Sequence, residues 1–184
     1  MTRPGRILAF FLCLVGVGLV SMVTDESQMV TRWYAGEVGE TISTPDYDVR
    51  VTEVRLAREV IVRDEPMSTE GVWVVVEWEA AAKRQSAAFS PVALVTADGT
   101  VFHERDEVAG LMGVPRTDPG FTGSGTSVFQ LPPDALDDVE LTIERSQGFL
   151  FTHGAGVRVA DVVPDDADVE DSHVIGPPTT EVTR

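Results

Sequence analysis

The sequence has a single cysteine, Cys13, and that residue lies inside its one long apolar run. The rest of the chain contains no thiol, which excludes an intrachain disulfide and a cysteine nucleophile there. A lipobox needs a small residue directly before the cysteine, but Leu12 precedes Cys13 and the apolar run continues beyond it. We therefore interpret Cys13 as a buried small hydrophobic residue rather than a lipidation site.

Positive charge is also scarce. Lys83 is the only lysine, and 14 basic residues stand against 30 acidic ones, for a net charge of -16. This balance argues against nucleic acid or anionic lipid as a partner. All of the acidic residues follow Val23. A charged partner of that part of the chain is expected to be basic or a cation.

Sequence motifs for catalysis, metals and cofactors are missing as well. His103, His153 and His173 are far apart in the sequence, so a zinc site would have to be assembled entirely by folding. The stretch Gly123-Ser124-Gly125 does not complete the G-x-S-x-G nucleophile elbow, and no phosphate-binding glycine-rich loop with lysine is present. We assign no catalytic, metal or cofactor-binding residue and expect no cofactor.

Two groups of acidic residues merit a separate test. The run from Asp165 to Asp171 lacks the glycine and the final glutamate of an EF-hand loop, so we interpret residues 164–184 as an acidic disordered tail. Glu77 and Glu79 are two residues apart, which places them on one face of a strand without requiring a catalytic pair.

Ile7 to Val23 is the apolar run, and it contains no charged residue. At 1.5 Å rise per residue its length of about 25 Å is at the short end of a membrane span. Arg3 and Arg6 precede it, so the positive-inside rule keeps the N-terminus in the cytoplasm and sends the remainder across. A cleaved signal peptide is the alternative, but no A-x-A cleavage site follows. We predict an uncleaved signal anchor, with the lipid bilayer as a partner.

The remainder is rich in short alternating apolar segments. Tyr47 to Leu56 alternates with a phase slip that predicts a bulge near Thr52 and Glu53, and Val72 to Trp78 is apolar on both faces, as in a central strand. The Asp98-Gly99 turn predicts a hairpin. Further strands are expected around Val128 to Leu131, Val139 to Ile143 and Val157 to Val163, with one helical turn at Asp134 to Leu136. Short strands without a long helical period predict an all-β, immunoglobulin-like antiparallel β-sandwich.

Two regions leave the interpretation open. Trp33 and Tyr34 fit either the membrane interface or a cap on the first strand. The region Glu104 to Gly125 reads as a long loop whose apolar residues either hold a protein partner or fold back over the open end of the core. The candidate interaction residues in this loop are Leu111, Met112, Val114 and Phe121.

Several segments in order resemble the telokin-like, immunoglobulin-like extracellular domains of membrane-anchored proteins of Gram-positive bacteria, especially actinobacteria. The segments are Gly39-Glu40, Tyr47 to Leu56, Val72 to Val76, Leu94 to Phe102, Pro119-Gly120 and Val128 to Pro132. The resemblance implies a β-sandwich ectodomain, in a family largely of unknown function without shared catalytic residues. Members often hang from a lipidated cysteine, and this chain departs from them in lacking a lipobox.

The sequence thus predicts a single-pass cell-membrane protein with an extracytoplasmic domain. We expect a non-enzymatic domain that contacts an envelope protein; the alternative is a metal-dependent or accessory enzyme with a carboxylate and histidine cluster, and a simple stalk is a third possibility. The expected parts are a cytoplasmic N-terminus (1–6), a transmembrane signal anchor (7–23), a juxtamembrane linker (24–38), the β-sandwich (39–163) and the disordered tail (164–184).

Overall fold

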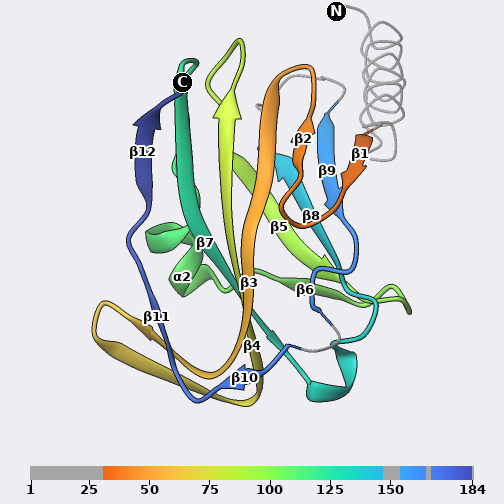
Figure 1. Cartoon of the computed structure of the whole chain (residues 1–184), viewed down its shortest axis with the longest axis vertical. Coiled ribbons are helices and arrows are strands. Elements are labelled where there is room, and N and C mark those ends of the chain that lie inside the picture. Colours follow the sequence, from red (N-terminus) through yellow and green to blue (C-terminus); the bar gives the residue numbers. More distant parts are fainter. Residues whose placement is uncertain (1–30, 147–153, 165–166, 184) are drawn as a thin grey trace, which may run out of the picture.

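The computed structural model describes residues 31–146, 154–164 and 167–183. The predicted signal anchor at 7–23 lies outside these residues. Within the described ranges, no helix has the length and apolar character needed to span a membrane. The described chain forms two packed β-sheets, so the predicted all-β sandwich is confirmed (Figure 1).

The first sheet has five strands in the order β1-β9-β8-β5-β6. Its strands are β1 (Arg32–Gly36), β5 (Phe89–Val95), β6 (Val101–His103), β8 (Glu140–Arg145) and β9 (Ala155–Val159). The second sheet has the order β10-β3-β4-β7-β12, with β2 and β11 also paired to β3. Its strands are β2 (Thr41–Ser43), β3 (Tyr47–Val62), β4 (Glu65–Ala82), β7 (Phe121–Leu131), β10 (Val169–Glu170), β11 (His173–Ile175) and β12 (Thr179–Val182).

The sandwich is not purely antiparallel, which corrects the prediction. Strand β1 runs parallel to β9, and both β10 and β11 run parallel to β3. All three lie near the ends of the chain, where a strand reaches a sheet edge without the tight turn that imposes antiparallel pairing.

Strand β4 shows why the central segment of the sequence is apolar on both faces. Val74, Val76 and Trp78 point into the main core between the sheets. Trp73 and Val75 point the other way, into a second core on the outer face of the second sheet. Helix α2 (Asp106–Met112) and Ile175 of β11 cover this second core. The predicted central strand is therefore buried on both sides.

Three local predictions are confirmed. The register of β3 against β4 shifts between Val51 and Glu53, as the phase slip predicted. Strands β5 and β6 pair as a hairpin around Gly99, whose φ of +84° is the conformation that favours glycine. The expected helical turn is the 3-10 helix η2 (Pro133–Ala135).

Parts of the predicted tail and linker form strands, which differs from the disorder and the linker expected for these segments. Residues 169–182 contribute three strands, and Ile175 is only 4% exposed in the second core. The N-terminal linker contributes β1, which begins at Arg32 and pairs with β9. Charge and length alone suggested disorder, but sheet pairing and one buried side chain stabilise these segments.

The region Glu104 to Gly125 is not one long loop. It contains the seven-residue helix α2, and β7 begins at Phe121. Two turns of helix are too short to display a sustained 3.6-residue period, which is why the sequence pattern did not reveal it. Asp106 and Glu107 occupy its first turn, where negative charge is favourable.

Candidate functional site

The four predicted interaction residues separate into two kinds. Met112 is 4% exposed in the second core, and Val114 is half-buried against the main core, so these two side chains are not free to hold a partner. Leu111 and Phe121 remain exposed, at 39% and 41%. Met112 and Val114 therefore fold back against the cores, and contact with a protein partner stays a prediction for Leu111 and Phe121.

Phe121 has an exposed apolar neighbour, Val182, from the segment that was predicted to be a disordered tail. Val182 of β12 lies directly opposite Phe121 in the antiparallel β7–β12 pair, and its side chain is 69% exposed. Directly opposed residues of an antiparallel pair project to the same face of the sheet. The pair forms an exposed apolar surface on the last strand of the second sheet, and we call it the Phe121–Val182 edge.

The glycines near this edge have a packing role. A Cβ on Gly125 would lie 2.5 Å from the backbone of Gly113 and Val114, and one on Gly123 would lie 2.6 Å from Thr117 Oγ1. The segment after α2 therefore passes directly over β7. Ser124, in the stretch that does not complete a nucleophile-elbow motif, lies within β7. Alternate glycines in a strand are a signal of close backbone approach.

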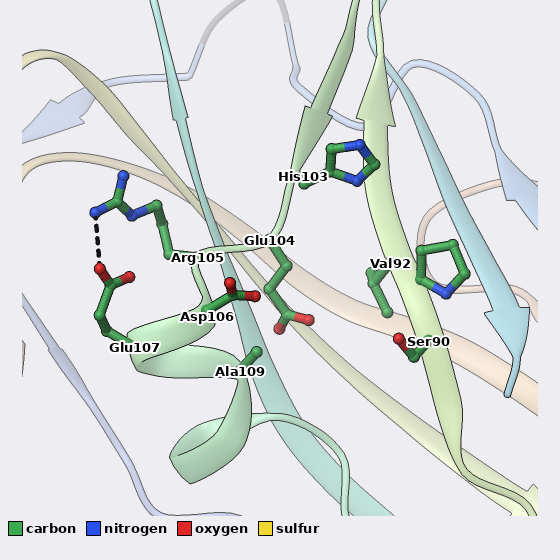
Figure 2. Close-up of a pocket in the computed structure, with 9 residues that line it drawn as sticks. Ser90, Val92, His103, Glu104, Arg105, Asp106, Glu107 and Ala109 are labelled. Atoms are coloured by element: carbon green, nitrogen blue, oxygen red, sulfur yellow. Dashed lines mark hydrogen bonds and ion pairs between the residues drawn. The ribbon is translucent and has the colours of Figure 1, made fainter.

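A pocket of about 570 Å³ lies where β5, β6 and α2 meet (Figure 2). Its lining includes Ser90, Pro91 and Val92 from β5, His103 from β6 and, after it, Glu104 to Glu107 and Ala109. Figure 2 shows the Glu104 carboxyl directed into the space between α2 and β5. The backbone N–H of Arg105 donates to the Val128 carbonyl, so this short segment joins β6 to the edge of β7.

Glu104 is a largely buried carboxyl with a raised pKa. Burial raises its pKa to about 7, the hydroxyl of Ser127 acts in the opposite direction, and the nearby charge of Asp106 raises it further. One carboxyl oxygen, Oε1, is buried without a hydrogen-bond partner. A carboxyl that changes charge near neutral pH at a pocket is a frequent feature of functional sites.

The pocket provides a direct test of the predicted histidine and carboxylate cluster. His103, Glu104, Asp106 and Glu107 do line the same pocket. Within the described ranges, however, no three His, Cys, Asp or Glu side chains lie close enough together to hold a metal ion. His153 lies outside the described residues, and His173 lies on β11.

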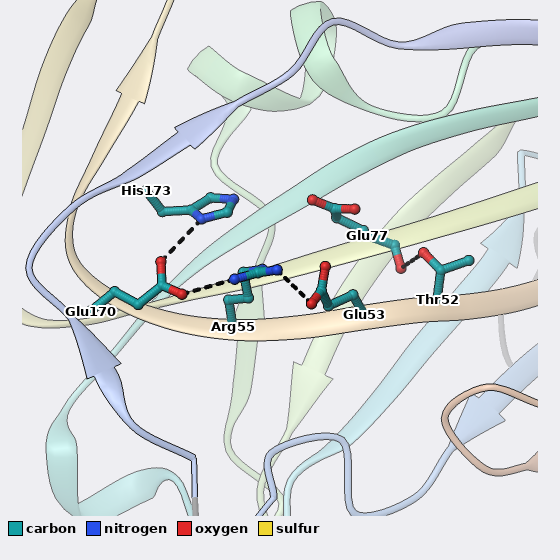
Figure 3. A network of polar contacts seen from close by, with 6 residues as sticks. All are labelled: Thr52, Glu53, Arg55, Glu77, Glu170 and His173. Atoms are coloured by element: carbon teal, nitrogen blue, oxygen red, sulfur yellow. Dashed lines mark hydrogen bonds and ion pairs between the residues drawn. The ribbon is translucent and has the colours of Figure 1, made fainter.

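His173 belongs to a separate polar network on the second sheet (Figure 3). The Arg55 guanidinium bridges Glu53 at 2.6 Å and Glu170 at 2.9 Å, and Glu170 also contacts His173 Nδ1 at 3.2 Å. The hydrogen bond from Arg55 is the main reason why the pKa of Glu170 is lowered. This network fastens β10 and β11 to β3, so part of the acidic tail has a structural role.

Glu77 and Glu79 lie on the same sheet. Glu77 is directly opposite Glu53 on β3, and Glu79 is opposite Arg50, with 4.0 Å between the Arg50 NH1 and Glu79 Oε1 atoms. The opposite charges of Arg50 and Glu79 favour sheet pairing, whereas the like charges of Glu53 and Glu77 oppose it. The two glutamates are accordingly part of the charged surface of β3 and β4.

Comparison with known proteins supports the β-sandwich fold but shows no family for this chain. No family model matches the sequence, and no curated protein matches it. The secreted protein MPT63 of Mycobacterium tuberculosis aligns with 70% of this chain and 98% of its own, at 16% sequence identity and a TM-score of 0.50.

An uncharacterised β-sandwich protein of Clostridium difficile aligns with 70% of this chain and 95% of its own, at 12% identity and a TM-score of 0.43. The telokin-like family stays a prediction. At such low identity, the likeness to MPT63 shows a shared β-sandwich fold and nothing further.

Proposed function

We propose that this chain is a membrane-anchored, extracytoplasmic binding domain that contacts a protein partner of the cell envelope without catalysing a reaction itself. The anchor is the apolar segment 7–23, oriented by Arg3 and Arg6. The β-sandwich is a rigid platform of the kind that presents binding surfaces at its edges and loops.

The observation that supports partner binding is the Phe121–Val182 edge. Two large apolar side chains that stand opposite each other and remain 41% and 69% exposed favour association with another surface. Strand β12 is also the last strand in its sheet order within the described ranges, so its outer backbone groups are available to an additional strand. The partner we propose offers an extended segment with apolar side chains.

The test is site-specific photo-crosslinking in intact cells that express the full chain. A photoreactive residue at position 121 or 182 is expected to give one discrete adduct. The matched control is position 101, since Val101 is also exposed but lies on β6 in the other sheet. No adduct at 121 and 182, or the same adduct at 101, would refute the proposed surface.

Membrane anchoring is tested separately. Mass spectrometry of the mature protein is expected to find segment 7–23 still attached, and protease added to spheroplasts is expected to remove the β-sandwich. A mature N-terminus just after this segment, or protection from protease, would overturn the proposed topology.

A second candidate function is a small-molecule or accessory enzymatic role at the Glu104 pocket. It is favoured by a perturbed acid beside His103 in a defined cavity. Screening amine and sugar ligands by NMR distinguishes it, because specific binding would shift resonances of His103 and of the α2 backbone, and Glu104→Gln would abolish those shifts.

A further inference from the structure

The alternation of side chains along β1 places Trp33 and Tyr34 on opposite faces of the first sheet. Tyr34 packs against the main core between the sheets. Trp33 is directly opposite Gly156 in the β1–β9 pair, and a Cβ on Gly156 would lie 2.5 Å from the indole ring. Since Val157 and Val159 point into the core, Gly156 and Trp33 lie on the outer face of the first sheet.

An arginine completes this outer surface. The Arg158 guanidinium carbon lies 4.4 Å from the centre of the Trp33 ring, in cation–π geometry. The Arg158 side chain is 43% exposed and forms an ion pair with Glu140, with 3.6 Å between Arg158 Nε and Glu140 Oε1. We call the surface formed by Trp33, Gly156 and Arg158 the Trp33–Arg158 face.

The tether places this face near lipid. Between the end of the predicted anchor at Val23 and the start of β1 at Arg32 stand residues 24–31, which at about 3.5 Å each reach no farther than about 28 Å. Strand β1 is also the edge strand of its sheet. The start of β1 is therefore held within about 28 Å of the end of the predicted anchor, at the edge of its sheet.

We propose that the Trp33–Arg158 face contacts the phospholipid headgroup layer of the membrane that anchors the chain. Tryptophan is favoured at the membrane interface, and arginine binds phosphate oxygens while its aliphatic stem stays in apolar contact. Glu140 and Glu144 on the adjacent strand β8 limit the positive charge of this face. It therefore fits a zwitterionic phospholipid surface, where the indole supplies the preference for the interface.

This orientation leaves the proposed partner surface free. In Figure 1, β1 and β12 lie at opposite sides of the molecule. A domain that rests on lipid through β1 and β9 presents the Phe121–Val182 edge away from that contact. The inference rests on the membrane anchor of the proposed function, so the experiment has to separate the two.

The experiment uses the full chain reconstituted in phosphatidylcholine vesicles, with or without lipids brominated near the headgroup. The other two tryptophans, Trp73 and Trp78, are buried in the sandwich and serve as an internal reference. Flotation of the vesicles with the protein tests the anchor. We expect bromine to quench one component of the tryptophan emission, and Trp33→Phe to remove that component while the emission of Trp73 and Trp78 is kept.

A second measurement does not depend on Trp33. In a Cys13→Ala background, a spin label at Ala35→Cys on β1 is expected to be more accessible to oxygen than to a polar nickel reagent, and the same label at Val101→Cys on β6 is expected to show the reverse. Flotation without quenching, or equal accessibility at the two labels, overturns the lipid contact while the anchor stands. Failure to float overturns the anchor and the contact together.

Discussion

The indole Nε1 of Trp78 donates a hydrogen bond of 2.9 Å to the Oγ of Ser127, and both residues are buried between the sheets. The Ser127 side chain also lowers the pKa of the Glu104 carboxyl, which burial raises. These three residues belong to β4, β7 and the segment after β6. The balance of hydrogen bonding and burial at Glu104 sets the pH range in which this carboxyl changes charge.

The pH dependence of stability tests the buried state of Glu104. Its folded-state pKa of about 7 lies above the ordinary value of 4.5, so folding favours the protonated acid. The stabilisation is complete below about pH 4.5 and is lost as pH rises through 7, which amounts to about 3 kcal/mol at 1.36 kcal/mol per pKa unit. Urea unfolding of the detergent-solubilised chain should show this decline, and Glu104→Gln should remove it.

Two other carboxyls with shifted pKa values act outside that window. The pKa values of Glu170 and Asp98 are lowered, chiefly by the Arg55 and Thr96 side chains, so their stabilisation is present above their unfolded pKa and is lost only in more acidic solution. An unchanged slope between pH 4.5 and 7 in Glu104→Gln would show that the acid is solvated in the folded protein.

Ser127→Ala tests the hydrogen bond from Trp78. The indole N–H would lose its partner while remaining buried, and we expect a loss of about 1–3 kcal/mol in the free energy of unfolding. Trp78→Phe removes the donor as well, so the double variant is expected to lose less than the sum of the two single losses. Strict additivity in this double-mutant cycle would mean that the two side chains are not coupled.

Local sequence signals predicted a large part of this fold. The bulge near Thr52, the turn at Gly99 and the apolar run of β4 each depend on neighbouring residues, and each was found where expected. The phase slip reports the bulge directly because side chains alternate along a strand.

The missed elements depend on contacts between residues far apart in the sequence. Strand β12 is defined by pairing with β7, and β1 by pairing with β9. The burial of Glu104 arises from packing of α2 against the sheet edge, and no local pattern distinguishes it from its neighbours Asp106 and Glu107. The Phe121–Val182 edge was missed for the same reason, because only the fold brings these two residues together.

Substitution of Ile175 tests whether strand β11 packs on the second sheet. Ile175 is 4% exposed in the second core, whereas its neighbour Val174 is 68% exposed. Ile175→Ala is expected to lower the free energy of unfolding by about 2–4 kcal/mol because it leaves a cavity against Trp73 and Val75. Val174→Ala is the matched control and should change stability by less than about 0.5 kcal/mol. Equal, small effects in chemical denaturation would show that the tail does not pack on the sheet.

The crossing of the segment after α2 over β7 is tested by adding one methyl group. In Gly125→Ala the new Cβ would lie 2.5 Å from the backbone of Gly113 and Val114, which cannot rotate away as a side chain can. We expect a loss of about 1–3 kcal/mol or more. Gly110→Ala is the control, since a Cβ there meets nothing within 4 Å and alanine in a helix gains about 0.5–1 kcal/mol over glycine. Thermal unfolding should move the two variants in opposite directions, and a shift of the same sign in both would contradict this packing.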